Sequence, residues 1–149
     1  MSFFEAINIA ASGLTAERTQ MDVTSENLAN AQTTNGPGGE PYEPQAVVLQ
    51  TVGGNSFTSA LASAIGGSTN APPAGGVEVT GIVSEKVPPE LVYDPGNPEA
   101  NKQGYVKMPN IQPVTEMTNL ISESNSYQAD VTAMETAKSM YSETLSILK

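Results

Sequence analysis

Two apolar ladders with a seven-residue spacing lie at opposite ends of this chain. The first consists of Ile7, Leu14, Met21 and Leu28, and the second of Leu120, Tyr127, Met134, Tyr141 and Leu148. An apolar residue at every seventh position keeps one face of a slightly underwound helix apolar, which is the pattern of coiled-coil packing. Because a lone amphipathic helix is only marginally stable in water, each ladder needs a partner. The pattern predicts terminal helices that assemble with each other or with neighbouring copies.

The helix boundaries follow from the Gly and Pro residues around the ladders. The first helix is predicted over residues 2–31, because the Gly-rich stretch at 36–39 cannot continue it. The second begins between Asn110 and Pro113, since proline is tolerated only in the first turn, and reaches the end of the chain. Beside its ladder lies an imperfect second row, consisting of Met117, Ser124, Val131, Lys138 and Leu145. Ser124 and Lys138 interrupt this row, so an ideal symmetrical dimeric zipper is not predicted.

Between the helices, the chain is predicted to form strands and loops. Segments rich in β-branched and aromatic residues lie at residues 45–52, 77–87, 91–93 and 105–108. Residues 53–76 consist mainly of Gly, Ser, Ala, Asn, Thr and Pro, which predicts a flexible loop. We therefore expect an α+β protein with three regions: an N-terminal helix (1–31), a small β-rich middle domain (32–112) and a C-terminal helix (113–149).

The two ladders can pair if the middle region returns the chain close to its starting point. The helices then form an antiparallel coiled coil, in which Leu28 lies near Leu120 and the other members follow in steps of seven. In this alignment Leu148 extends past the N-terminus and can meet a neighbour. The register is less certain than the direction, because a shift of one heptad preserves both ladders.

Composition excludes several classes of function. The formal net charge of −10, with only six scattered Lys and Arg residues, is unsuited to contacts with nucleic-acid phosphates. The chain has no histidine and no cysteine, which removes the usual general base, His and Cys metal ligands and disulfides. Carboxylates could still support catalysis, and the candidates are Glu85, Glu90, Asp94 and Glu99. Solvated acidic loops are far commoner, so we expect no enzyme, cofactor, metal or small-molecule substrate.

The sequence pattern also predicts neither a membrane-spanning helix nor a cleaved targeting signal. No apolar run approaches the roughly 18 residues that a membrane-spanning helix requires. Glu5 interrupts the apolar start of the chain and the first basic residue is Arg18, so no cleavable signal peptide is predicted. We expect any export to use a route that does not read such a signal.

Motifs near both ends resemble a known family. Residues 10–16 (AASGLTA) and 21–31 (MDVTSENLANA) are similar to the N-terminal signature of bacterial flagellar axial proteins, which include rod, hook and hook-associated subunits. Residues 126–129 (SYQA) and 138–140 (KSM) resemble the C-terminal motif of that family. The positions that carry this resemblance most clearly are Gly13, Asn27, Leu28, Ala29, Asn30, Tyr127 and Gln128.

Other segments narrow the resemblance. Most axial proteins continue from Asn-Leu-Ala-Asn into a Thr-x-Gly-Tyr turn, whereas this chain inserts residues 35–41 before Tyr42. That insertion, together with residues 91–98 and 104–110, resembles the proximal rod subunits of the family. Alternatives are another axial subunit of the same family or, from a different class, a cytoplasmic coiled-coil adaptor.

The resemblance implies a structural subunit of the flagellar rod, the drive shaft that crosses the periplasm. It further implies export by the flagellar type III apparatus without a cleaved signal peptide. The implied partners are other rod subunits, copies of the same chain and the export apparatus. Members pack their terminal helices into the wall of a tube, while the middle domain faces outward.

Overall fold

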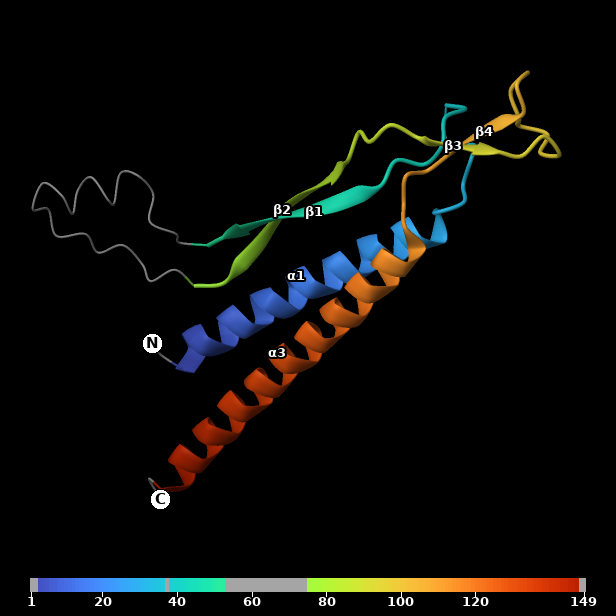
Figure 1. Cartoon of the computed structure of the whole chain (residues 1–149). Helices are drawn as coiled ribbons and strands as arrows, with labels where there is room; N and C mark the ends of the chain where they lie inside the picture. Colours follow the sequence, from blue (N-terminus) through green and yellow to red (C-terminus); the bar gives the residue numbers. More distant parts are fainter. Residues whose placement is uncertain (1–2, 37, 53–74, 148–149) are drawn as a thin grey trace, which may run out of the picture. The chain divides into compact units, whose positions relative to one another are not determined.

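The computed structural model describes residues 3–36, 38–52 and 75–147. Along the chain, four short strands lie between a long helix at each end (Figure 1). The elements are α1 (Phe3–Ala29), β1 (Gln45–Thr51), β2 (Val77–Ser84), β3 (Glu90–Tyr93), β4 (Tyr105–Met108) and α3 (Pro113–Ile147). The predicted α+β class, with a terminal helix at each end and a small sheet-containing middle, is confirmed.

Both helices have ends that their sequences explain. Helix α1 ends at Ala29, and the following turn is closed by a hydrogen bond from the Thr33 backbone N–H to the Asn30 carbonyl (3.0 Å). The Asn30 side chain donates back to the Glu26 carbonyl (2.9 Å), which satisfies an acceptor in the last turn. Helix α3 begins with Pro113, whose missing N–H is not needed in a first turn.

The strands form two separate two-stranded sheets, one of β1 with β2 and one of β3 with β4. In the second sheet the strands are antiparallel, with Val92 opposite Val106 and Tyr93 opposite Tyr105. Alternation along the strands buries Val106, which is 1% exposed, and places both tyrosines on the other face. The two tyrosine rings meet edge to face with their centroids 5.3 Å apart.

The described residues fall into two compact units. The first draws on residues 1–18, 49–80 and 125–149, and the second consists of residues 19–48 and 81–124. Each unit contains part of α1 and part of α3, and each is considered separately below. The division into regions 1–31, 32–112 and 113–149 stays a prediction, and most of the predicted loop at 53–76 lies outside the described residues.

Few side chains are deeply buried. Within the described residues, the buried apolar side chains are those of Ala16, Val23, Ala31, Val106 and Pro109. Large apolar side chains remain exposed on α3, including Val114 (78%), Ile121 (63%) and Met140 (65%). Across the ranges that the structure covers, neither helix combines the length and apolarity needed to cross a bilayer.

Candidate assembly site

The two apolar ladders occupy half-buried positions on their helices. In α1, all four members (Ile7, Leu14, Met21 and Leu28) are half-buried. In α3, Leu120, Tyr127 and Met134 are half-buried, whereas Tyr141 is 40% exposed. Leu148 lies outside the described residues. Each helix therefore turns most of its ladder away from full solvent exposure.

A row of acidic residues shares the half-buried face of α3. Glu116, Glu123 and Asp130 are seven residues apart, and Ala137 continues the row. These four positions alternate with Leu120, Tyr127 and Met134 at spacings of four and three, as the two core positions of a heptad do. We call Glu116, Glu123 and Asp130 the carboxylate row. A charged residue at such a position is expected to weaken helix pairing and to restrict its geometry.

The imperfect second row of α3 reaches exposed positions at its two ends. Met117 is 54% exposed and Leu145 is 48% exposed, so neither belongs to the half-buried face. The sequence prediction did not include Glu116, Glu123 and Asp130, and their spacing of seven was the signal that could have identified them.

In the first unit, Gly13 of α1 lies directly against Asp130 of α3. A Cβ atom added at Gly13 would come within 2.5 Å of the Asp130 Oδ2 atom. Gly13 is the only glycine of α1, so this is the one position on that helix without a side chain. The close approach of Asp130 therefore depends on glycine at this position.

The neighbouring Ser12 holds the start of β2. Its hydroxyl donates to the Ile9 carbonyl (2.7 Å) and accepts from the Val77 backbone N–H (3.1 Å). Gly76, just before the strand, has a φ of +100° and approaches Ser12 so closely that a Cβ would collide with the hydroxyl. The motif Ser12-Gly13 thus contacts β2 through one residue and α3 through the next.

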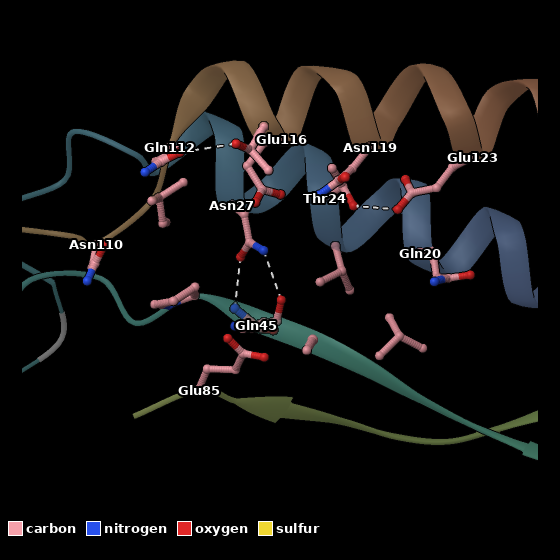
Figure 2. A pocket seen from close by; sticks show the side chains of 16 residues that line it. Gln20, Thr24, Asn27, Gln45, Glu85, Asn110, Gln112, Glu116, Asn119 and Glu123 are labelled. Carbon is pink, nitrogen blue, oxygen red and sulfur yellow. Dashed lines mark hydrogen bonds between the residues drawn. The ribbon is translucent and has the colours of Figure 1, made fainter. Parts of the chain in front are cut away.

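In the second unit, the buried side chain of Asn27 attaches α1 to the start of β1. Its amide donates to the Gln45 carbonyl (2.8 Å) and accepts from the Gln45 backbone N–H (2.9 Å), as Figure 2 shows. The Tyr42 hydroxyl donates to the same Asn27 oxygen (3.1 Å). A further hydrogen bond joins Asn27 to the Glu116 side chain. These four bonds match the two donors and two acceptor lone pairs of an amide.

The insertion that distinguishes this chain brings Tyr42 to Asn27. The Tyr42 backbone N–H donates to the Thr33 carbonyl (3.1 Å), and the Gly36 N–H donates to the Glu40 carbonyl (2.7 Å). The two bonds close the segment into a loop whose ends lie together. The inserted residues therefore lengthen the turn after α1 without moving Tyr42 away from that helix.

A polar cavity of about 470 Å³ lies beside Asn27 in the second unit (Figure 2). The Thr24 hydroxyl donates to Glu123 Oε1 (2.9 Å), while Glu123 Oε2 is buried without a hydrogen-bond partner in the structure. Glu85 and Glu116 also line the cavity. Desolvation, together with the nearby carboxylates of Glu123 and Glu85, raises the pKa of Glu116, although its hydrogen bond with Asn27 acts in the opposite direction.

These acidic groups do not form a recognisable chemical site. Among the described residues, no group of three or more His, Cys, Asp or Glu side chains could hold a metal ion. Of the candidate carboxylates, Asp94 accepts from the Gly96 N–H (3.2 Å) and so shapes a turn. Glu90 and Glu99 are exposed, and only Glu85 lines the cavity. The hydrogen bonds beside the cavity join α1 to α3 and to β1.

The remaining motif residues lie near the ends and surfaces of the helices. Leu28 and Tyr127 are half-buried, whereas Ala29 and Gln128 are exposed. Asn30 accepts a hydrogen bond from the Thr33 hydroxyl (3.1 Å) in addition to the one it donates. The buried part of the N-terminal motif therefore serves contacts within the chain, and the exposed residues leave their side chains accessible.

Comparison with known proteins identifies the family. Residues 7–37 match the family described as "Flagella basal body rod protein", and residues 102–147 match "Flagellar basal body rod FlgEFG protein C-terminal". The flagellar basal-body rod protein FlgC of Bacillus subtilis is 46% identical over 153 aligned positions that cover 100% of both chains. The FlgC proteins of Escherichia coli O6:H1 and Salmonella typhimurium are 42% and 40% identical, with 99% of this chain covered in each case.

The chain belongs to the FlgC family of flagellar basal-body rod proteins. Members of the FlgC family are structural subunits of the rod and not enzymes, which confirms the two corresponding predictions. The resemblance to rod proteins that the sequence motifs carried is also confirmed. Family membership places the chain in the flagellar basal body, in assembly with other rod components.

Proposed function

We propose that this FlgC-family subunit assembles into the rod through its terminal helices, which pair within each subunit as an antiparallel coiled coil. The predicted interface consists of Ile7, Leu14, Met21, Leu28, Leu120, Tyr127, Met134, Tyr141 and Leu148. Contacts in both units support the pairing. Thr24 bonds Glu123 in the second unit, and Gly13 lies against Asp130 in the first. Gly13 precedes Thr24 in α1, whereas its partner Asp130 follows Glu123 in α3, as antiparallel helices require.

The observation that carries assembly is the exposed apolar surface of α3. Val114, Met117 and Ile121 are 78%, 54% and 63% exposed, and their spacing of three and four places them on one side of the helix. Exposed apolar side chains of this size are stabilised when a neighbouring subunit covers them. The half-buried ladders then hold each subunit together, while this side of α3 contacts other rod subunits or copies of the chain.

The proposal extends to the route and location of assembly. The subunit reaches the periplasm through the flagellar type III export apparatus without a cleaved signal peptide, and it joins the part of the rod that spans this compartment. The middle domain, residues 32–112, faces outward from the helical wall. Family membership and the long terminal helices support this arrangement.

A matched pair of substitutions tests the assembly surface. Ile121→Asp places a charge in the proposed intersubunit contact, whereas the control Ser122→Asp adds the same charge at the next exposed position, around the helix. We expect Ile121→Asp to abolish incorporation into purified basal bodies and motility, with normal subunit levels, and Ser122→Asp to retain both. Normal rods with Ile121→Asp would refute the proposed surface.

A further inference from the structure

The carboxylate row of α3 lies at half-buried positions, where a charged side chain costs solvation energy. Three acidic side chains lie on the half-buried face of a helix, and none of the three contacts described for them involves a cation. Apolar residues at the same positions would pair the helices more strongly, because partial burial of a carboxylate costs solvation energy. The best-attested role of a polar group in a helical seam is to specify register.

We propose that the carboxylate row fixes the register of α3 against α1 and so determines which single alignment of the two ladders is adopted. This inference rests on the helix pairing put forward under Proposed function and adds the residues that select its alignment. The apolar ladders cannot make this selection, because a slip of seven residues again places apolar residues opposite one another.

Each member of the row meets a group on α1 that suits it. Glu123 accepts the hydrogen bond of the Thr24 hydroxyl (2.9 Å), and Glu116 is hydrogen-bonded with Asn27. Asp130 occupies the space left by the missing side chain of Gly13. For antiparallel helices, paired residue numbers have a nearly constant sum. The sums are 147 for Thr24 with Glu123, and 143 for both Asn27 with Glu116 and Gly13 with Asp130. Because a seam residue lies between two residues of its partner helix that are three or four positions apart, sums that differ by four belong to one register, whereas a slip of one heptad changes every sum by seven.

A slip of one heptad in one direction loses all three contacts. Glu123 would move from Thr24 to Glu17, which places two carboxylates together. Asp130 would move from Gly13 to Ala6, where a Cβ fills the space that glycine leaves open. Glu116 would move from Asn27, a buried amide held by Gln45, to the half-buried Gln20, for which no such bonds to Gln45 are described. Like-charge repulsion and steric overlap therefore both oppose this slip.

The opposite slip is no better. Glu123 would meet Ala31, which lies beyond the end of α1 at Ala29 and offers no hydroxyl. Asp130 would meet Gln20, whose side chain is far larger than the hydrogen atom of Gly13. Because Gly13 is the only glycine in α1, just one register gives Asp130 its space. The ladders supply the affinity of the two helices, and the carboxylate row supplies the choice of alignment.

Crosslinking between cysteines can measure this choice directly, since the chain contains no cysteine of its own. One reporter carries cysteines at Met21 and Ser124, two half-buried positions whose sum of 145 lies between the sums of the observed contacts. The other carries cysteines at Leu28 and Ser124, whose sum of 152 corresponds to a slip of one heptad. A short bis-maleimide reagent is applied to dilute purified full-length chain, and the yields of intramolecular product are compared.

In the parent chain, we expect the in-register reporter to exceed the slipped reporter by about tenfold. Removing the row with Glu116→Leu, Glu123→Leu and Asp130→Ala together should reduce this preference to about twofold, without lowering the helix content or the midpoint of urea unfolding. The matched control replaces two exposed acids of the same helix, Glu135→Leu and Glu143→Leu, and should keep the parental preference. A variant that was only destabilised would have a lower midpoint of urea unfolding. Slipped crosslinks with an unchanged midpoint therefore report a change of register.

Gly13→Ala provides a second test if the triple variant does not fold. The added methyl group takes the space of Asp130, so the register preference should fall. Adding Asp130→Ala to the same chain removes the overlap and should restore in-register crosslinking.

The outcomes separate the two proposals. Absence of both intramolecular products in the parent chain would refute the helix pairing and the register inference together. An in-register parent whose preference survives both the triple variant and Gly13→Ala would leave the pairing in place and overturn the role of the carboxylate row.

Discussion

Replacing Asn27 by alanine should destabilise the second unit far more than removing another asparagine from the same motif. Asn27 is 5% exposed and makes three hydrogen bonds of 2.8–3.1 Å with Gln45 and Tyr42. At about 1 kcal/mol for each bond, the substitution should lower the free energy of unfolding by about 3 kcal/mol. For a chain of this size, that change lowers Tm by about 10 °C.

The matched control is Asn30→Ala. Asn30 also makes two side-chain hydrogen bonds, but they are local and solvent can replace them, so the loss should be about 1 kcal/mol or less. Urea unfolding gives the free energies, and amide hydrogen exchange at Gln45 reports the lost contact directly. Equal losses for the two variants, or unchanged protection at Gln45 in Asn27→Ala, would refute the reasoning that Asn27 attaches β1 to α1.

Three other predictions follow from individual groups. Desolvation raises the pKa of Glu116, so this carboxyl binds a proton more readily in the native state than in the unfolded state. Protonated Glu116 therefore contributes to stability below the usual pKa of 4.5, and this contribution is lost as the pH rises through the raised pKa. Glu116→Gln should therefore stabilise the protein at pH 7 but not at acidic pH, and equal stabilisation at both values, measured by urea unfolding, would contradict this assignment. Val106→Ala removes two buried methyl groups and should cost about 2 kcal/mol in the same assay, whereas Val114→Ala at an exposed position should cost less than about 0.5 kcal/mol in the dilute subunit. Gly104 has a φ of +83° and its added Cβ would lie 2.9 Å from the Tyr93 ring, so Gly104→Ala should lower Tm, and an unchanged Tm would show that the turn relaxes easily.

The sequence predicted the secondary structure well because each element has a strong local signal. The Gly-rich stretch placed the end of α1 to within two residues and Pro113 marked the start of α3, while runs of β-branched residues marked β1 through β4. The predicted strand at 77–87 was too long, since β2 ends at Ser84 before a segment with two prolines. Local chemistry decided these boundaries, so no knowledge of distant contacts was required.

The contacts within the site were less predictable. Gly13 and Asn27 were recognised as motif residues, but their partners Asp130 and Gln45 are more than 15 residues away in sequence. The carboxylate row on α3 was not predicted, because only apolar residues were considered for the helix pairing. In this chain the three carboxylates lie against a glycine, a hydroxyl and an amide, and that match is visible only when both helices are seen together.

The scarcity of deeply buried side chains also determines how this subunit should respond to its own concentration. Among the described residues, Val106 is the only large side chain that is less than 2% exposed. Unfolding of a dilute chain therefore hydrates little additional apolar surface, and both its heat-capacity increment and its denaturant m-value should be small for 149 residues. We expect assembly to bury the exposed apolar side chains of α3, so by mass action the order of the subunit should increase with the amount of polymer formed.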